Sequence, residues 1–282
     1  MEPTAAPATQ ISRSDLVGVV LAAGAGSRIA PLSGLLPKAL CPVGNRALVD
    51  LALDRLTGLV DGLAVNAHHF ADRVLRHLDS EWGEAVHLSI EPDEALGTAG
   101  GVARLRTWID GRAAVIVNAD SWSPTSLAPI IDGWDGQRVR VMVNGEGGFG
   151  PRSQIVASTL PWSVVKDLRE QPSGLYEVVW RELFASDELE VVHHHGPFID
   201  CGTPSDYLNA NLSAVEVHGT SIIAEDVVID DGVNVEGSVI GAGAHIRGDV
   251  IASVVWPNQV VGPDERLIRS IRAGTSVTVG PL

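Results

Sequence analysis

The chain has 282 residues, of which 45% are hydrophobic and 20% charged, a composition typical of folded proteins. Its net charge of −15 argues against nucleic acid and anionic membranes as partners, because like charges repel. Cys41 and Cys201 lie far apart in sequence and indicate neither a disulfide framework nor a structural zinc site. Residues 1–15 lack the features of an export signal, and no apolar run is long enough to cross a membrane. We therefore expect a cytoplasmic protein with a disordered tail over residues 1–15.

Short apolar strands alternate with helices in the first part of the chain. Continuous β-branched runs at residues 16–22, 62–66 and 113–118 predict strands buried on both faces, and alternation predicts another at 86–90. Apolar residues at helical spacing predict the intervening helices, the third with Thr98 as its N-cap. This order predicts a doubly wound, mostly parallel α/β sheet with its ligand site at the carboxyl ends of the strands.

Short repeated units, each opened by an aliphatic residue, begin after residue 222. They start five or six residues apart, at Ile223, Ile229, Val235, Ile240 and Ile246. A six-residue period is typical of a parallel β-helix, in which the aliphatic residues stack inside, whereas hairpin strands with glycine turns are the alternative. We expect a short hexapeptide-repeat β-helix over residues 218–282, after a larger domain over residues 16–217. So few coils favour a role in packing or homo-oligomer assembly over an acyltransferase.

The segment after the first strand carries the strongest chemical signal. It reads Gly-x-Gly-Ser-Arg over residues 24–28, with a Pro-Lys pair at residues 37–38. Glycines let backbone N–H groups approach a phosphate, and Arg28 and Lys38 supply positive charge that this acidic chain otherwise lacks. The dinucleotide-binding fingerprint needs a third glycine and a P-loop needs Gly-Lys-Ser/Thr, so neither of these phosphate loops is present.

Two aspartates form a candidate metal site. Asp120 follows the predicted strand at 113–118, and Asp200 follows the apolar pair Phe198-Ile199. Two carboxylates suit Mg²⁺, which binds through one or two carboxylates together with substrate phosphates. Alone, either aspartate is more simply a helix cap or turn residue, but their shared context favours the metal site.

These motifs resemble those of the sugar-1-phosphate nucleotidyltransferases, also called nucleotide-sugar pyrophosphorylases. Besides residues 24–38, Leu96-Gly-Thr-Ala-Gly-Gly is similar to the family's second nucleotide-contacting loop. Val117-Asn-Ala-Asp is similar to its metal-binding turn, usually Asn-Gly-Asp, and the segment from Phe198 to Asn211 is similar to the one bearing its second metal-binding aspartate. The resemblance implies a glycosyltransferase-A-like nucleotidyltransferase fold with a left-handed β-helix after it, Mg²⁺ as cofactor, and a nucleoside triphosphate and a sugar 1-phosphate as substrates.

The resemblance also implies roles for individual residues. Arg28 would hold the β- and γ-phosphates, Lys38 would bridge the α-phosphate and the sugar phosphate, and Asp120 with Asp200 would hold Mg²⁺. The nucleotide-binding residues that it implies are Leu21, Ala23, Gly24, Gly26, Ser27, Arg28, Gly97 and Thr98. The family's Glu-Lys-Pro stretch, which contacts the sugar phosphate, is missing here. The candidates for that contact are Lys38 and Asn118, with Lys166 and Glu177 as the nearest substitutes for the missing stretch.

The reaction implied is transfer of a nucleoside monophosphate to a sugar 1-phosphate with release of pyrophosphate, and Arg28, Lys38 and Asp120 would be its catalytic residues. The loop at residues 96–100 resembles that of mannose-1-phosphate guanylyltransferases, and its small residues leave room for a purine, so we expect GTP with a mannose-type sugar. The domain equally resembles N-acetylmuramate-1-phosphate uridylyltransferases, which makes UTP or dTTP the alternative donor. The missing Glu-Lys-Pro stretch leaves a second alternative, a non-catalytic regulatory subunit that binds a nucleotide sugar.

Overall fold

The structure, a computed structural model, describes residues 11–274 and 277–282. Within these residues the chain forms two compact units. The first, called the sheet unit, contains residues 11–24, 52–119 and 125–198, and the second, called the repeat unit, contains the other described residues. Residues 1–10 of the expected tail lie outside the described residues. The expected domain boundary at residues 217 and 218 stays a prediction.

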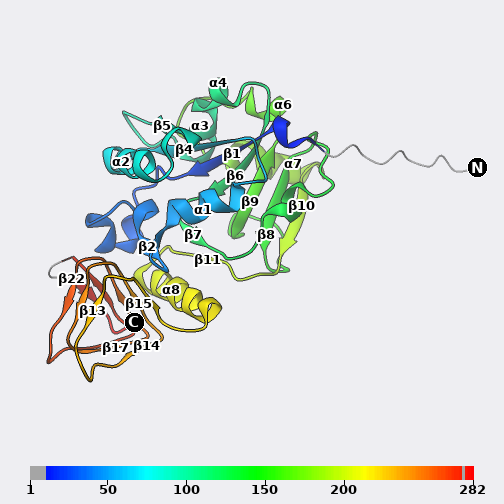
Figure 1. The fold of residues 1–282 in the computed structure, drawn as a ribbon. Helices are drawn as coiled ribbons and strands as arrows, with labels where there is room; N and C mark the ends of the chain where they lie inside the picture. The colour runs from blue at the N-terminus through cyan, green and yellow to red at the C-terminus, as the bar shows by residue number, and fades with distance from the viewer. Residues whose placement is uncertain (1–10, 275–276) are drawn as a thin grey trace, which may run out of the picture. The chain divides into compact units, whose positions relative to one another are not determined.

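A seven-stranded sheet forms the centre of the sheet unit, in the order β10-β8-β9-β6-β1-β4-β5 (Figure 1). All neighbouring strands are parallel except the two pairs that include β9. The strands are β1 (Leu16–Leu21), β4 (Gly62–Ala67), β5 (Val86–Ile90), β6 (Ala113–Asn118), β8 (Arg140–Asn144), β9 (Ile155–Leu160) and β10 (Glu190–His194). The mostly parallel sheet is therefore confirmed, and all four strands predicted from the sequence are present within one residue of their expected ends.

Both faces of the interior strand β1 are buried, as its continuous apolar sequence predicts. Val17 and Val19 pack in one core with residues of α3, whereas Leu16 and Val20 point to the opposite face and are also buried. The helices are α1 (Leu48–Leu56), which contains residues of both units, α2 (Ala71–Glu81), α3 (Gly97–Arg104), α4 (Arg106–Ile109), α5 (Ala128–Ile131), α6 (Trp162–Val165) and α7 (Arg181–Ala185), with a π-helical turn η6 (Tyr176–Trp180) before α7. No helix in the described part of the chain is long and apolar enough to span a membrane.

The repeats form a parallel β-helix of three coils (Figure 1). Its first sheet is β12 (Ile222–Ile223), β15 (Val239–Ile240), β18 (Val254–Val255), β21 (Ile271–Ala273) and the antiparallel closing strand β22 (Val277–Val279). Its second sheet is β13 (Val228–Ile229), β16 (His245–Ile246) and β19 (Val260–Val261), and its third is β14 (Val235–Glu236), β17 (Asp249–Ile251) and β20 (Arg266–Ile268). The predicted repeat architecture is confirmed, and the left hand of the coil stays a prediction.

The first coil differs from the expectation that every repeated aliphatic residue is inside. Ile240 and Ile246 are fully buried in the second coil, but Ile223 and Ile229, which pair with them in register, are 42% and 38% exposed. The first coil is the end of the solenoid, so no preceding coil covers its inward side chains. The prediction of burial is therefore wrong for these two residues.

One hydrophobic core joins the coils to the rest of the repeat unit. It includes Tyr207 of α8 (Pro204–His218) and Trp256, whose indole Nε1 donates a hydrogen bond of 2.9 Å to the Tyr207 hydroxyl. Tyr207 in turn donates to the carbonyl oxygen of Pro42, and Asn45 Nδ2 donates to that of Ile240 over 2.7 Å. Pro42 lies in β2 (Pro42–Val43), and Asn45 lies in the turn that joins β2 to β3 (Arg46–Ala47) in one hairpin. The coils are therefore part of the same packed body as α8 and this hairpin.

Candidate functional site

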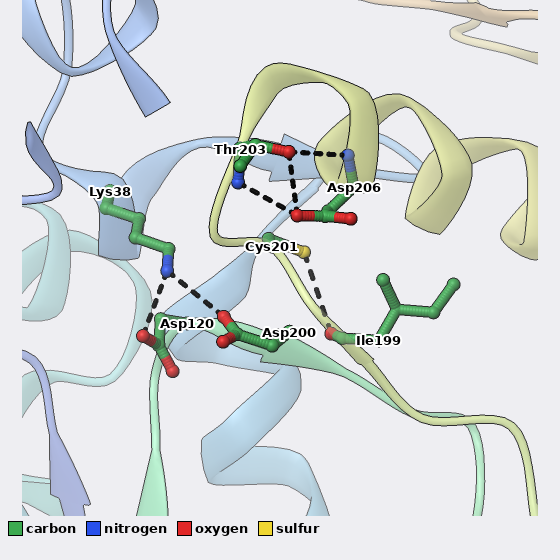
Figure 2. Close-up of polar contacts among 7 residues, drawn as sticks. All are labelled: Lys38, Asp120, Ile199, Asp200, Cys201, Thr203 and Asp206. Carbon is green, nitrogen blue, oxygen red and sulfur yellow. Dashed lines mark hydrogen bonds and ion pairs between the residues drawn. The ribbon is translucent and has the colours of Figure 1, made fainter. Parts of the chain in front are cut away.

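Lys38 contacts both candidate metal-binding aspartates within the repeat unit (Figure 2). Its Nζ atom lies 2.9 Å from Oδ2 of Asp120 and 3.4 Å from Oδ1 of Asp200. Lys38 is 7% exposed, whereas each aspartate side chain is 42% exposed. The three residues predicted to act at the reacting phosphates are therefore brought together, with the ammonium group between two carboxylates that solvent can reach.

A short antiparallel pair of strands places the two aspartates side by side. Asp120 precedes β7 (Ser121–Trp122), and Asp200 ends β11 (Ile199–Asp200), which pairs with β7. The backbone N–H of Cys201 donates to the carbonyl oxygen of Asp120 over 2.9 Å. Asp200 does not cap α8, because Thr203 is the N-cap and forms a capping box with Asp206 (Figure 2). A helix-capping role, which was the alternative to metal binding for Asp200, therefore belongs to Thr203.

Two glycines of the motifs lie directly against the charged groups. Gly26 has a left-handed backbone with φ of 61°, and a Cβ atom there would lie 3.0 Å from Cβ of Lys38. A Cβ on Gly202 would lie 3.4 Å from Nη2 of Arg28 and 3.5 Å from Oδ1 of Asp200. Gly26 is therefore needed both for its backbone conformation and for space beside Lys38.

The local electrostatics suit a bound cation. Burial raises the pKa of Asp200, and the charge of Asp120 raises it further, while Lys38 and Arg28 act in the opposite direction. Among the described residues no group of three or more His, Cys, Asp or Glu side chains could hold a metal ion. Two carboxylates alone match the oxygen donors that Mg²⁺ takes from proteins when substrate phosphates and water complete its shell. The residues present therefore fit this cofactor.

The sheet unit contains a separate cavity of about 140 Å³, lined by several predicted site residues. Leu21, Thr98, Asn118 and Glu177 all contribute to its wall. Lys166 does not line it and is exposed at the end of α6. The structure thus brings Glu177 together with Asn118 but does not bring Lys166 to them. Of the other predicted nucleotide-binding residues, Ala23 is buried, and Gly24 and Ser27 are exposed.

Trp180 is a cavity residue that the sequence did not reveal. It is 8% exposed, and its indole Nε1 has no hydrogen-bond partner among the described residues. A buried donor without a partner costs free energy unless a ligand or a water molecule accepts a hydrogen bond from it. The aromatic residues Tyr176 and Trp180 were the sequence signal that could have indicated this part of the cavity wall. Nothing in the local pattern, however, distinguished them from core residues.

The glycines of the loop at residues 96–100 allow close packing against other backbone segments, and they do not leave empty space. A Cβ on Gly97 would lie 2.6 Å from the carbonyl oxygen of Ser173, and one on Gly100 would lie 2.3 Å from that of Gln171. The space that we attributed to a purine is therefore filled by backbone at these two residues. Thr98 is also not the N-cap, because α3 begins at Gly97, and its hydroxyl instead accepts a hydrogen bond of 2.8 Å from the N–H of Leu175.

Comparison with known proteins gives a consistent result. The profile described as the MobA-like NTP transferase domain matches residues 18–188. An N-acetylmuramate alpha-1-phosphate uridylyltransferase of Caulobacter vibrioides is 34% identical over 140 residues, which are 46% of this chain and 58% of the relative, so the match spans less than two thirds of that protein. A mannose-1-phosphate guanyltransferase of Schizosaccharomyces pombe is 25% identical over 73% of this chain and 67% of its own length.

A solved structure supports the fold assignment. The protein comes from Bacillus anthracis and is provisionally named a glucose-1-phosphate thymidylyltransferase. It has a TM-score of 0.60 and 18% sequence identity over 71% of this chain and 95% of that chain. This likeness confirms the expected nucleotidyltransferase-like fold.

Proposed function

The chain belongs to the family of MobA-like NTP transferase domains, and on this premise we propose that it joins a nucleoside triphosphate to a sugar 1-phosphate. The products are a nucleotide sugar and pyrophosphate. The observation that carries the proposal is the contact of Lys38 with both Asp120 and Asp200. These groups supply a cation for phosphate oxygens and two carboxylates for a divalent metal ion. Relatives named as uridylyl- and guanyltransferases of sugar 1-phosphates support the same reaction class.

The chemistry requires positioning more than proton transfer. An oxygen of the sugar phosphate attacks the α-phosphorus, a P–O bond forms, and the bond to the β-phosphate oxygen breaks as pyrophosphate leaves. The attacking oxygen is already anionic, so no general base is needed, and the main task is to hold two anions together. We assign Lys38 to the α-phosphate and the sugar phosphate, and Arg28 to the β- and γ-phosphates. Asp120 and Asp200 would hold Mg²⁺, which neutralises charge at the reacting phosphate when bound.

The cavity of the sheet unit is proposed to take the sugar. Asn118 and Glu177 offer polar groups for hydroxyls, and the free indole N–H of Trp180 offers a donor. A small number of polar groups in an otherwise apolar wall is typical of sites that fix the orientation of a small ligand. This arrangement provides a sugar-binding wall without the Glu-Lys-Pro stretch of the family.

GTP and UTP are the two donors to be compared first. Gly97 and Gly100 leave no room for a purine, because backbone atoms fill the space beside them. GTP stays a proposal on the likeness to the guanyltransferase, and UTP is the alternative on the likeness to the uridylyltransferase. The sugar, the cytoplasmic location and assembly through the repeats also stay predictions.

A pyrophosphate-release assay tests the proposal. The full chain is incubated with Mg²⁺ and each pairing of GTP, UTP, dTTP, CTP or ATP with mannose, glucose or aminosugar 1-phosphates. We expect release with at least one pairing and loss of about 100-fold or more in kcat for Asp120→Asn and Asp200→Asn, because each removes a carboxylate that would hold the charge-neutralising Mg²⁺. Asp93→Asn, at an exposed residue, is the matched control. Nucleotide-sugar binding without pyrophosphate release from any pairing would instead favour the regulatory subunit.

A further inference from the structure

Asn66 and Glu91 form a buried polar pair at the ends of neighbouring strands of the sheet unit. Asn66 lies in β4 and Glu91 directly follows β5, and each is 1% exposed. Nδ2 of Asn66 donates a hydrogen bond of 2.7 Å to Oε1 of Glu91. Buried polar groups are costly unless their hydrogen bonds are made, so the orientation of both side chains is strongly determined.

The outer atoms of the pair hold the backbone of two separate loops. Oδ1 of Asn66 accepts a hydrogen bond of 2.7 Å from the N–H of Ala22, just after β1. Oε2 of Glu91 accepts one of 2.7 Å from the N–H of Leu96, just before α3. A single chain of hydrogen bonds thus runs from Ala22 through Asn66 and Glu91 to Leu96. It connects the loops that we assigned to nucleotide contact.

Helix α3 closes the space around this pair. A Cβ atom on Gly101 would lie 2.6 Å from Nδ2 of Asn66 and 3.0 Å from Oε1 of Glu91. The backbone of Glu91 is also held, because its N–H donates to the carbonyl oxygen of Ala67 over 2.8 Å, and its carbonyl oxygen lies 2.7 Å from Nδ1 of His68. The pair therefore has little room to reorient, and a change in its hydrogen bonds must be taken up by the two loops.

We propose that Asn66 and Glu91 are positioning residues that set the separation of the loops at residues 21–24 and 96–98, and thereby the affinity and base selectivity of nucleotide binding. The inference rests on the proposed function, because that function assigns both loops to the nucleotide. The pair acts through backbone N–H groups and does not itself touch the substrate. Its effect is expected in the KM for the nucleotide and in the preference among bases, more than in kcat.

A reciprocal exchange of amide and carboxylate tests the pair without changing its size. In Asn66→Asp two carboxylate oxygens face each other, and in Glu91→Gln an amide nitrogen faces a donor, either Asn66 Nδ2 or the N–H of Leu96. In the double variant Asn66→Asp, Glu91→Gln, the Gln amide donates to the Asp carboxylate. Both outer oxygens then still accept from Ala22 and Leu96. The double variant thus restores every hydrogen bond with the polarity of the central one reversed.

Three measurements separate positioning from a merely structural role. Nucleotide affinity is measured by titration calorimetry with the five nucleoside triphosphates, kcat and KM by pyrophosphate release, and stability by thermal unfolding. We expect each single variant to raise Kd and KM for the preferred nucleotide by about tenfold and to narrow its advantage over other bases, with kcat within a few-fold. The double variant should recover most of both losses. Glu94→Gln, an exposed carboxylate in the same loop, should change none of them.

The outcomes distinguish this inference from the proposed function. Single variants that lose thermal stability but keep the affinity and base preference of the wild type would show a structural role only and overturn the inference. The inference would also be overturned if the double variant bound the nucleotide no more tightly than the single variant with the lower affinity. Absence of turnover in the wild type with every substrate pairing would count against the proposed function, while nucleotide affinity would still test the pair.

Discussion

Lys38 donates a hydrogen bond of 2.9 Å from Nζ to Oδ2 of Asp120, across 82 positions of sequence. The same ammonium group lies 3.4 Å from Oδ1 of Asp200. Two neighbouring carboxylates repel each other, so a cation between them stabilises both charges. Lys38 therefore stabilises the negative charge of both aspartates, through oxygen atoms that a bound metal ion would also need.

This relationship predicts competition between Lys38 and a divalent metal. Lys38→Met removes the charge at similar size, so in the absence of substrates Mn²⁺ should bind more tightly, by up to about tenfold at these half-exposed carboxylates. Turnover should fall by about 100-fold, because the charge at the reacting phosphates is lost. Electron paramagnetic resonance of free Mn²⁺ measures the affinity. Lys166→Met, at the exposed lysine, should affect neither quantity, and unchanged Mn²⁺ affinity in Lys38→Met would contradict the competition.

Replacing Trp180 should selectively weaken the binding of the sugar 1-phosphate. Its indole N–H has no partner among the described residues, so Trp180→Phe breaks no hydrogen bond and should lower thermal stability only through the smaller ring. If a sugar hydroxyl accepts this hydrogen bond, KM for the sugar 1-phosphate should rise by about five- to tenfold, with KM for the nucleotide unchanged. Steady-state kinetics with each substrate varied separately measure the two constants. Equal values in variant and wild type would remove Trp180 from the sugar site.

Because both cysteines are buried, we expect the folded protein to resist thiol reagents. Both are buried, and burial raises the pKa of Cys41 to about 12 and raises that of Cys201 as well. The reactive thiolate is therefore scarce at pH 8. A disulfide reagent should react with neither thiol before unfolding and with both in guanidinium chloride.

The pKa of Cys41 in the folded protein lies above its ordinary value of 9.0, so the folded state favours the neutral thiol. The contribution of Cys41 to stability should therefore be lost as pH rises from about 9 to 12.

The sequence predicted those parts of the fold that local patterns determine. The β-branched run at β1 and the apolar run at β6 required buried strands, and the aspartate after β6 could be placed at a strand end. The strand β9 was not predicted, because its buried Ser158 and Thr159 interrupt the apolar pattern, and its antiparallel insertion depends on partners elsewhere in the chain. The exposure of Ile223 was equally hidden, since the repeat pattern alone does not indicate whether another element covers the first coil.

The candidate site was predictable where motifs carry charge and unpredictable where packing decides. Arg28, Lys38 and the two aspartates were recognised from residue type and order. The role of Gly97 was misjudged because its neighbour, the backbone at Ser173, lies far away in sequence. Asn66 is the second-to-last residue of β4 and Glu91 directly follows β5, and a polar residue near a strand end is a usable signal for a polar role. Their pairing, however, depends on the register of β4 against β5.

The core shared by the coils and α8 predicts how loss of the repeats affects the protein. A chain ending at Thr220 would expose Tyr207 and its apolar neighbours, which Val239, Val254 and Trp256 now cover. We expect this shortened chain to keep measurable turnover but to unfold at a lower temperature or to self-associate. Trp256→Phe offers a smaller change, because it keeps most of the ring and removes the hydrogen bond to the Tyr207 hydroxyl.

Trp256→Phe should lower the free energy of unfolding by about 1 kcal/mol through the lost hydrogen bond, and further through the packing lost with the smaller ring. Tyr207→Phe removes the hydroxyl from the other side, and the double variant should cost less than the sum of the two single changes, because the two residues share one interaction. Chemical denaturation with fluorescence and circular dichroism measures the three values. Strictly additive losses would show that the hydrogen bond between Trp256 and Tyr207 does not stabilise the attachment of the coils to α8.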